Sequence, residues 1–168
     1  MRSSGPAGDT SSSKKVLEYA FLLLKFRLRS EKELADRLLR KKFSASLVKQ
    51  TVGFLKEKRF IDDRAFAKAW VASRLGKPMG VRRLVQELRL KGIDKKLIDE
   101  AIAEQSRQGY DEAAAVRGIV ESRLTRLKGL EPKIIKNRLY AYLVRRGYSP
   151  EVIIDELSRI RGNEYDDS

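Results

Sequence analysis

Basic residues that could bind phosphate groups recur at matched places along the chain. Guanidinium and ammonium groups form charge-assisted hydrogen bonds with phosphate and carboxylate oxygens, so such residues are candidates for contact with a polyanion or an acidic protein surface. The candidate contact residues fall into three sets: Arg37, Arg40, Lys41 and the neighbouring Lys42; Arg82, Arg83, Arg89 and Lys91; Arg138, Arg145 and Arg146.

Many of these residues have a second explanation in helix stability. Cations in the last turn of a helix interact favourably with the negative end of the helix dipole. The pair Arg82–Arg83 does not fit this explanation, because it stands at an expected helix start, where positive charge is unfavourable. We therefore expect this pair to be the preferred contact site.

No residue pattern points to catalysis. The chain has no cysteine and no histidine, the two commonest side chains for nucleophile and base chemistry. Asp62 and Asp63 could suggest a metal or acid–base pair, but adjacent carboxylates at a helix start usually cap it, and no third ligand is in view. Phe66 and Trp70 could stack on bases, but their i, i+4 spacing favours a packed helix face. We expect no catalytic residue, no metal site, no cofactor and no enzyme activity.

These residues lie in a repeat. Residues 34–55, 84–105 and 139–160 align without gaps, and VASRL at 71–75 is echoed by VESRL at 120–124. The first leucine of each segment is followed by another at i+4, which predicts one apolar helix face. Glycine then follows at 92 and 147, where a left-handed helix end favours it. Lys42 takes this place in the first segment, so the helix end there is expected to be less well defined.

A second helix is predicted to begin after each corner. Ser44, Asp94 and Ser149 occupy the N-cap position, and Pro150 stands at the first helical position of the last helix. Each segment is also preceded by a further helical pattern. The sequence therefore predicts three helices in each repeat.

The predicted fold class is all-α, with three tandem three-helix modules. A module of this size buries too little surface to be comfortable alone, so stacking into an elongated, curved rod is expected; a single compact bundle is the alternative. The third module has about six extra residues around 125–133. The expected segments are a disordered tail at 1–15, modules at 16–62, 63–108 and 109–161, and an acidic tail at 162–168.

The overall charge favours an acidic partner. The chain has 37 lysines and arginines against 23 acidic residues, for a net charge of +14. Such a field attracts nucleic acid, an anionic membrane surface or an acidic protein groove. No apolar run is long enough to span a membrane, and the lack of cysteine fits a reducing compartment, so a cytoplasmic location is expected.

Several stretches resemble the RecX family of bacterial recombination regulators. They are SEKELADRLLRKKFS (30–44), FIDDRAFAKAWVASRL (60–75), GVRRLVQELRLKGID (80–94) and RRGYSPEVI (145–153). The resemblance covers about residues 16–161. Lys42 in place of glycine and the longer connection in the third module are departures from the pattern.

The resemblance implies both a fold and a function. It implies three tandem three-helix modules, the RecA recombinase filament on single-stranded DNA as partner, and inhibition of the recombinase, ATPase and co-protease activities of RecA. It supplies no catalytic residues. We further expect contact with single-stranded DNA through its phosphates, no membrane partner and a monomeric chain. The alternative is a sequence-neutral DNA-binding protein of helix-turn-helix-like modules.

Overall fold

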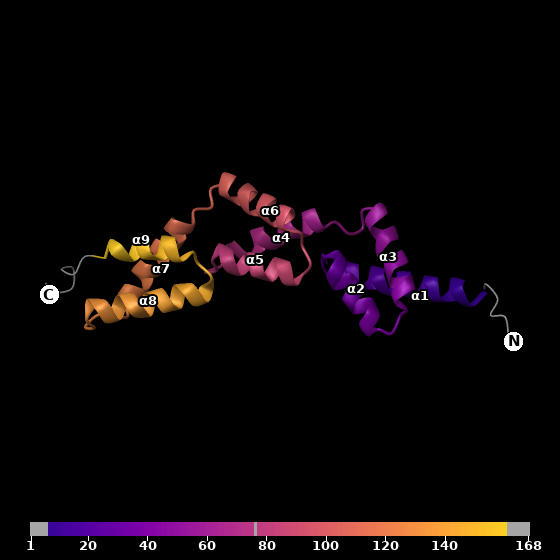
Figure 1. The fold of residues 1–168 in the computed structure, drawn as a ribbon, viewed down its shortest axis with the longest axis horizontal. Coiled ribbons are helices and arrows are strands. Elements are labelled where there is room, and N and C mark those ends of the chain that lie inside the picture. The colour runs from indigo at the N-terminus through magenta and orange to yellow at the C-terminus, as the bar shows by residue number, and fades with distance from the viewer. Residues whose placement is uncertain (1–6, 76, 161–168) are drawn as a thin grey trace. The chain divides into compact units, whose positions relative to one another are not determined.

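The computed structural model describes residues 7–75 and 77–160, and the regular secondary structure of this part of the chain is all α-helix (Figure 1). No strand occurs among these residues, which confirms the all-α prediction and the three helices per module. The helices are α1 (Ala7–Phe26), α2 (Glu31–Arg40), α3 (Ala45–Glu57), α4 (Asp63–Leu75), α5 (Val81–Leu90), α6 (Lys95–Arg107), α7 (Glu112–Leu124), α8 (Pro132–Arg146) and α9 (Pro150–Ser158).

Tails were expected at both ends of the chain, at 1–15 and at 162–168. The helix α1 begins at Ala7, well inside the segment 1–15 that was expected to be a disordered tail. Residues 11–15 of this helix are exposed, and Val16 is the first buried residue after them. The expected acidic tail at 162–168 lies outside the described residues, and the expected rod-like shape stays a prediction.

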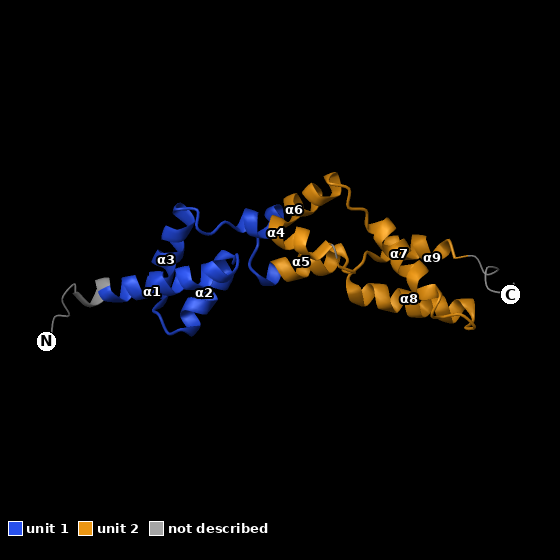
Figure 2. Ribbon diagram, turned by 180° about the vertical axis from the view of Figure 1, so that it is seen from behind, with its two compact units in different colours: residues 1–67, 89–97 blue, residues 68–88, 98–168 orange. Residues whose placement is uncertain are grey.

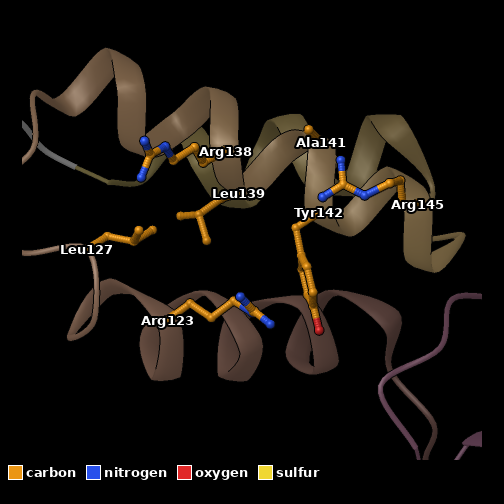
Figure 3. A pocket seen from close by; sticks show the side chains of 7 residues that line it. All are labelled: Arg123, Leu127, Arg138, Leu139, Ala141, Tyr142 and Arg145. Carbon is orange, nitrogen blue, oxygen red and sulfur yellow. The ribbon is translucent and has the colours of Figure 1, made fainter.

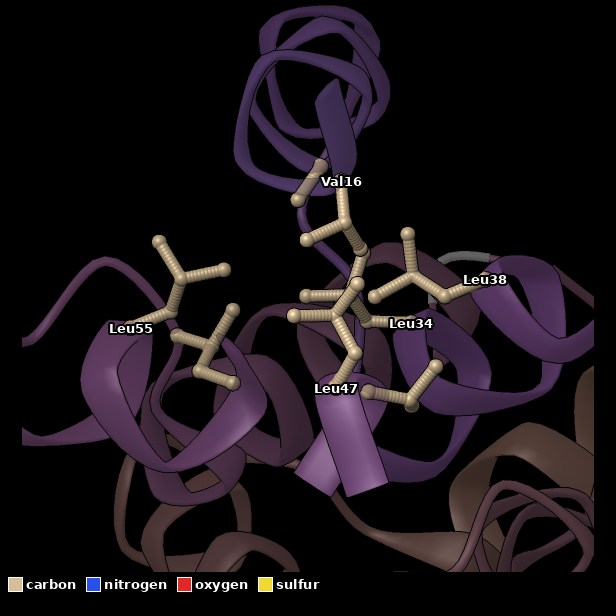
Figure 4. Packing of buried hydrophobic residues seen from close by; sticks show 8 residues of the cluster. Val16, Leu34, Leu38, Leu47 and Leu55 are labelled. Atoms are coloured by element: carbon tan, nitrogen blue, oxygen red, sulfur yellow. The ribbon is translucent and has the colours of Figure 1, made fainter. Parts of the chain in front are cut away.

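The chain divides into two compact units, with boundaries inside α4, α5 and α6 (Figure 2). One unit combines residues 1–67 with 89–97, and the other combines 68–88 with 98–168. In the first unit, α1, α2 and α3 enclose an apolar core (Figure 4). Its fully or nearly fully buried members include Val16, Leu34, Leu38, Leu47 and Leu55.

The second unit has its own core between α7, α8 and α9. Apolar side chains from all three helices meet there, and Tyr148 fills the corner between α8 and α9. The i, i+4 leucines that defined the repeat are buried in every module, as the periodicity predicts: Leu34 and Leu38, Leu84 and Leu88, Leu139 and Leu143.

The corners of the repeat follow the predicted capping chemistry in most places. Ser44 accepts a hydrogen bond from the backbone N–H of Leu47, and Asp94 accepts one from the N–H of Lys96. Gly92 and Gly147 have φ values of 80° and 84°, as expected for left-handed helix ends. Ser149 differs, because its hydroxyl donates to Glu112 Oε2 at 2.7 Å instead of capping α9.

The expectation of a poorly defined helix end at Lys42 is wrong. The helix α2 ends at Arg40, and Lys42 adopts a left-handed φ of 70° although it is not glycine. The lysine thus takes the conformation that Gly92 and Gly147 take in the other modules.

Lys42→Gly is expected to stabilise the fold by about 0.5–1 kcal/mol. Relief of the left-handed conformation gains about 1–2 kcal/mol, and the greater freedom of glycine in the unfolded chain cancels part of it. Urea unfolding of both proteins measures the difference. Lys41→Gly is the control, since Lys41 has a φ of −78° and gains nothing from glycine. Equal or lower stability of Lys42→Gly than of the parent would contradict the strain argument.

Within the first unit, the start of α2 is held by residues from the beginning of α4 and the end of α5. The Ser30 hydroxyl donates to the Lys91 carbonyl at 2.7 Å, and the Glu31 N–H donates to Asp63 Oδ1 at 2.8 Å. Gly92 faces Lys32 so closely that a Cβ at Gly92 would lie 2.6 Å from the lysine Cβ. We call this set of contacts the first junction.

The second unit contains the same arrangement one repeat later, which we call the second junction. The Gly80 N–H donates to the Arg146 carbonyl, and the Arg82 N–H donates to the Gly147 carbonyl, both at 3.0 Å. The Val81 N–H donates to Glu112 Oε1 at 3.0 Å, in the place of the bond from Glu31 to Asp63. The repeat therefore preserves contacts between helices as well as the helices themselves.

Glu33, which forms an ion pair with Lys91 beside the first junction, makes the stability of the fold depend on pH. Burial raises its pKa, but hydrogen bonds from Arg27 and Lys91 outweigh burial and lower the pKa from 4.5 to about 2. A carboxylate whose pKa is lower in the folded than in the unfolded state stabilises the fold above its unfolded pKa. This contribution is lost as the pH falls through the folded pKa.

Glu33→Gln should therefore flatten the acid limb of the stability profile. The free energy of unfolding of the variant is expected to fall less between about pH 5 and pH 2 than that of the parent. Urea unfolding at each pH measures both slopes. Glu121→Gln, at an exposed position of α7, is the control and should leave the profile of the parent unchanged. Parallel profiles for Glu33→Gln and the parent would contradict the assignment.

Candidate functional site

One face of α8 presents two of the predicted contact arginines with a tyrosine between them. Arg138, Tyr142 and Arg145 are spaced i, i+4 and i+7, which places them along one side of a helix with 3.6 residues per turn. Arg123 reaches toward them from α7, and its guanidinium carbon lies 3.5 Å from the centre of the Tyr142 ring. This close stacking fixes the plane of the guanidinium.

These residues line a pocket of about 330 Å³ between α7 and α8 (Figure 3). A second hollow of about 520 Å³ shares Arg123 and Tyr142 with it and continues along α7 toward Pro78. We call the two hollows together the basic trough. None of the described residues that line it is a carboxylate, and its cationic members are Lys77, Arg123, Arg126, Arg138 and Arg145.

The preceding repeat shows a different arrangement at the corresponding residues. Arg74 corresponds to Arg123, and Glu87 corresponds to Tyr142. Glu87 lies 3.8 Å from the Arg74 guanidinium and also accepts a hydrogen bond from the Trp70 indole at 3.1 Å. The carboxylate offsets the charge of Arg74, whereas the tyrosine supports Arg123 without a negative charge, and no carboxylate of the described residues pairs with Arg123.

The trough brings together part of the third predicted set. Arg138 and Arg145 line it, and the Arg146 guanidinium lies 5.3 Å from the centre of the same tyrosine ring. Neither Arg123 nor Tyr142 was among the contact residues predicted from the sequence. The echo between VASRL and VESRL was the available signal for Arg123, since it aligns this arginine with Arg74.

The second predicted set divides into exposed and structural residues. Arg82 and Arg89 have exposed side chains. Arg83 lies 3.4 Å from Glu87, one turn further along α5, and its backbone packs against Gly147. Lys91 forms an ion pair with Glu33 beside the first junction. Arg83 and Lys91 therefore have structural partners that the sequence did not reveal.

The first predicted set belongs to the first unit. Arg37, Arg40 and Lys41 are exposed at the end of α2. The Lys41 ammonium lies 5.6 Å from the centre of the Tyr19 ring, so this lysine is held against α1.

The acidic and aromatic residues of α4 have structural roles. Asp62 accepts hydrogen bonds from the N–H groups of Arg64 and Ala65, as an N-cap does, and Phe66 is buried. Asp63 accepts from Glu31 across the first junction, and burial raises its pKa. Among the described residues, no group of three potential ligands could hold a metal ion.

No helix within residues 7–75 and 77–160 combines the length and the apolar character needed to cross a bilayer.

A repeated three-helix architecture with a basic trough, whose described lining holds no carboxylate, is typical of proteins that bind a polyanion or another macromolecule. Three family models match the chain, and they describe the first, second and third three-helix domains of RecX. They cover residues 17–55, 62–102 and 110–155, respectively. The chain belongs to the RecX family.

Individual relatives agree with this assignment. The chain is 34% identical over 151 residues to a protein named regulatory protein RecX from Chlorobium phaeobacteroides, covering 89% of this chain and 96% of that protein. It is 38% identical over 141 residues to a protein of the same name from Bacillus licheniformis. That match covers 83% of this chain but spans about half (51%) of the Bacillus protein.

Solved structures share the fold. A crystal structure of RecX from Lactobacillus salivarius superimposes with a TM-score of 0.79 at 19% identity, covering 90% of this chain and 97% of that chain. A second crystal structure, of a regulatory protein RecX, gives a TM-score of 0.74 at 20% identity and covers 86% and 72%, respectively.

Proposed function

We propose that this chain is a non-catalytic regulator that binds the RecA recombinase filament on single-stranded DNA. In this proposal it inhibits the recombinase, ATPase and co-protease activities of RecA, and so modulates recombination and the SOS response. The match of all three modules to the RecX family carries the proposal. Relatives named regulatory protein RecX support the regulatory part of it.

The charge of the molecule is compatible with such a partner. A filament on DNA presents phosphates, and the net charge of +14 attracts the chain toward them. In the second unit the basic trough concentrates cations without a lining carboxylate. Several modules that each make weak contacts can together give strong binding along a repeating partner.

Titration into a RecA–single-stranded-DNA ATPase assay tests the proposal. Stoichiometric amounts of the protein are expected to lower both DNA-dependent ATP hydrolysis and strand exchange. Electron microscopy or light scattering reports whether filaments remain during the assay. If saturating protein leaves both activities unchanged while the filament is intact, the chain is not an inhibitor of RecA.

Direct, sequence-neutral DNA binding is the second candidate function, and the basic trough favours it. The two candidates differ in their relative affinities for bare and RecA-coated DNA. A RecA-directed regulator binds coated single strands much more tightly than bare ones at physiological salt. A direct DNA-binding protein shows the reverse order, and its affinity falls steeply as salt rises.

A further inference from the structure

We propose that the basic trough on α7 and α8 is a binding site for the phosphodiester backbone of single-stranded nucleic acid. This inference rests on the proposed function, because it identifies the part of the molecule that contacts the DNA of the filament. Arg138 and Arg145 contact phosphate oxygens from α8, and Arg123 contacts them from α7 (Figure 3).

The composition of the trough selects an extended anion. Five cations line the two connected hollows, and none of the described lining residues carries a negative charge. A single acidic side chain would satisfy one of these arginines and leave the others without a partner. A strand with one phosphate per nucleotide supplies an anion to each of them in turn.

The trough is also distinct from the rest of the basic surface. In the first unit, the pocket between α2 and α3 contains Glu31 beside Lys32 and Lys49, so its charge is partly compensated. In the preceding repeat, Glu87 lies beside both Arg74 and Arg83. The third module differs at this position, because Tyr142 supports an arginine there without neutralising it.

Tyr142 acts here as a support for arginines, which makes the site insensitive to base identity. The guanidiniums of Arg123 and Arg146 lie 3.5 Å and 5.3 Å from the centre of the ring. A ring engaged in this way does not stack on bases, so the trough reads the backbone. Oligothymidylate and oligodeoxycytidylate should therefore bind with similar affinity.

The geometry does not favour groove reading by the last helix of the module. A helix-turn-helix protein inserts its recognition helix into the negatively charged major groove. The helix α9 has no lysine or arginine to contact phosphates: its exposed face carries Glu151 and Asp155, and Asp155 is paired with Arg159 just after the helix. The trough arginines Arg123, Arg138 and Arg145 lie on α7 and α8 instead. A single strand that runs along the surface of these two helices can contact all three.

A charge-matched pair of variants tests the site. Arg138→Gln combined with Arg145→Gln removes two cations of the trough at exposed positions. Lys128→Gln combined with Lys133→Gln removes two exposed cations that do not line it. Fluorescence anisotropy with a labelled oligothymidylate gives the dissociation constant of each protein at several salt concentrations.

The arginine variant is expected to bind about tenfold more weakly than the parent. Its slope of log K against log salt should be shallower by about 1.4, since each lost phosphate contact removes about 0.7. The lysine variant should retain the slope of the parent. Equal losses in the two variants would show a general charge effect and overturn the site.

A third comparison gives position 142 the glutamate that the preceding repeat has at position 87. Tyr142→Glu places a carboxylate beside Arg123 and should weaken binding to the oligonucleotide, whereas Tyr142→Phe retains the ring and should not. Circular dichroism melts check that both variants fold. Equal binding by folded Tyr142→Glu and Tyr142→Phe would overturn the role given to the uncompensated arginines.

The RecA assay separates failure of this inference from failure of the proposed function. If the parent inhibits RecA and the arginine variant binds oligothymidylate like the parent, the site is wrong and the function stands. If the arginine variant no longer inhibits RecA but still binds oligothymidylate like the parent, the trough contacts protein, and the phosphate site is again wrong. If the parent does not inhibit RecA but the arginine variant loses oligonucleotide binding as expected, the site stands and the function does not.

Discussion

Gly147→Ala is expected to lower the free energy of unfolding by about 3 kcal/mol. Part of this loss is the left-handed φ of 84°, which costs a residue with a side chain about 1–2 kcal/mol. The rest is steric, because the new Cβ would lie 2.7 Å from the backbone nitrogen of Arg83. The neighbouring Arg82 N–H is bonded to the Gly147 carbonyl, so the two backbones cannot separate without losing that bond.

Gly129→Ala is the matched control for this substitution. Gly129 has a nearly identical φ of 85°, but a Cβ there would meet no atom within 4 Å. Its expected cost is therefore the conformational part alone, about 1 kcal/mol. Urea unfolding of the two variants and the parent separates the two contributions. If both substitutions cost the same, the second junction does not contribute the steric part.

Glu112→Ala is expected to destabilise the fold by about 2 kcal/mol. Glu112 accepts a hydrogen bond from the Val81 N–H with one oxygen and from the Ser149 hydroxyl with the other. The first N–H groups of a helix have no partner inside the helix, so the Val81 N–H would lose its acceptor. Thermal and urea unfolding measure the loss.

Glu121→Ala provides the comparison on the same helix. Glu121 is exposed on α7, and its removal should change the free energy of unfolding by no more than about 0.5 kcal/mol. A loss for Glu112→Ala as small as this would mean that solvent replaces the carboxylate at the second junction.

The helices and their buried faces could be predicted from the sequence because they depend on local periodicity. The i, i+4 leucines such as Leu84 and Leu88 are buried as the 3.6-residue repeat requires. Ser44 caps its helix for the same local reason, since its hydroxyl reaches an N–H three residues later. The family resemblance, which rests on short motifs in all three modules, could also be recognised at this level.

The meaning of Lys42 was decided by the tertiary structure. Lys32 and Arg83 lie at the start of the second helix of the preceding module, and they face Gly92 and Gly147, respectively. A side chain at either glycine would therefore overlap a neighbour. Lys42 takes the same left-handed conformation with its side chain exposed. The sequence shows the left-handed position in all three modules, but it does not show which of them must also leave room for a neighbour.

The roles of the charged residues depended on tertiary structure to a similar extent. Arg83 and Lys91 looked like free surface cations, yet Glu87 and Glu33 are their partners. Glu33 is 58 residues from Lys91 in the sequence, a separation that no local pattern connects. The partner of Arg123 is Tyr142, where the preceding repeat has Glu87. The sequence determines where positive charge can occur, whereas the fold determines which charges are compensated, because compensation depends on the distance between side chains in space.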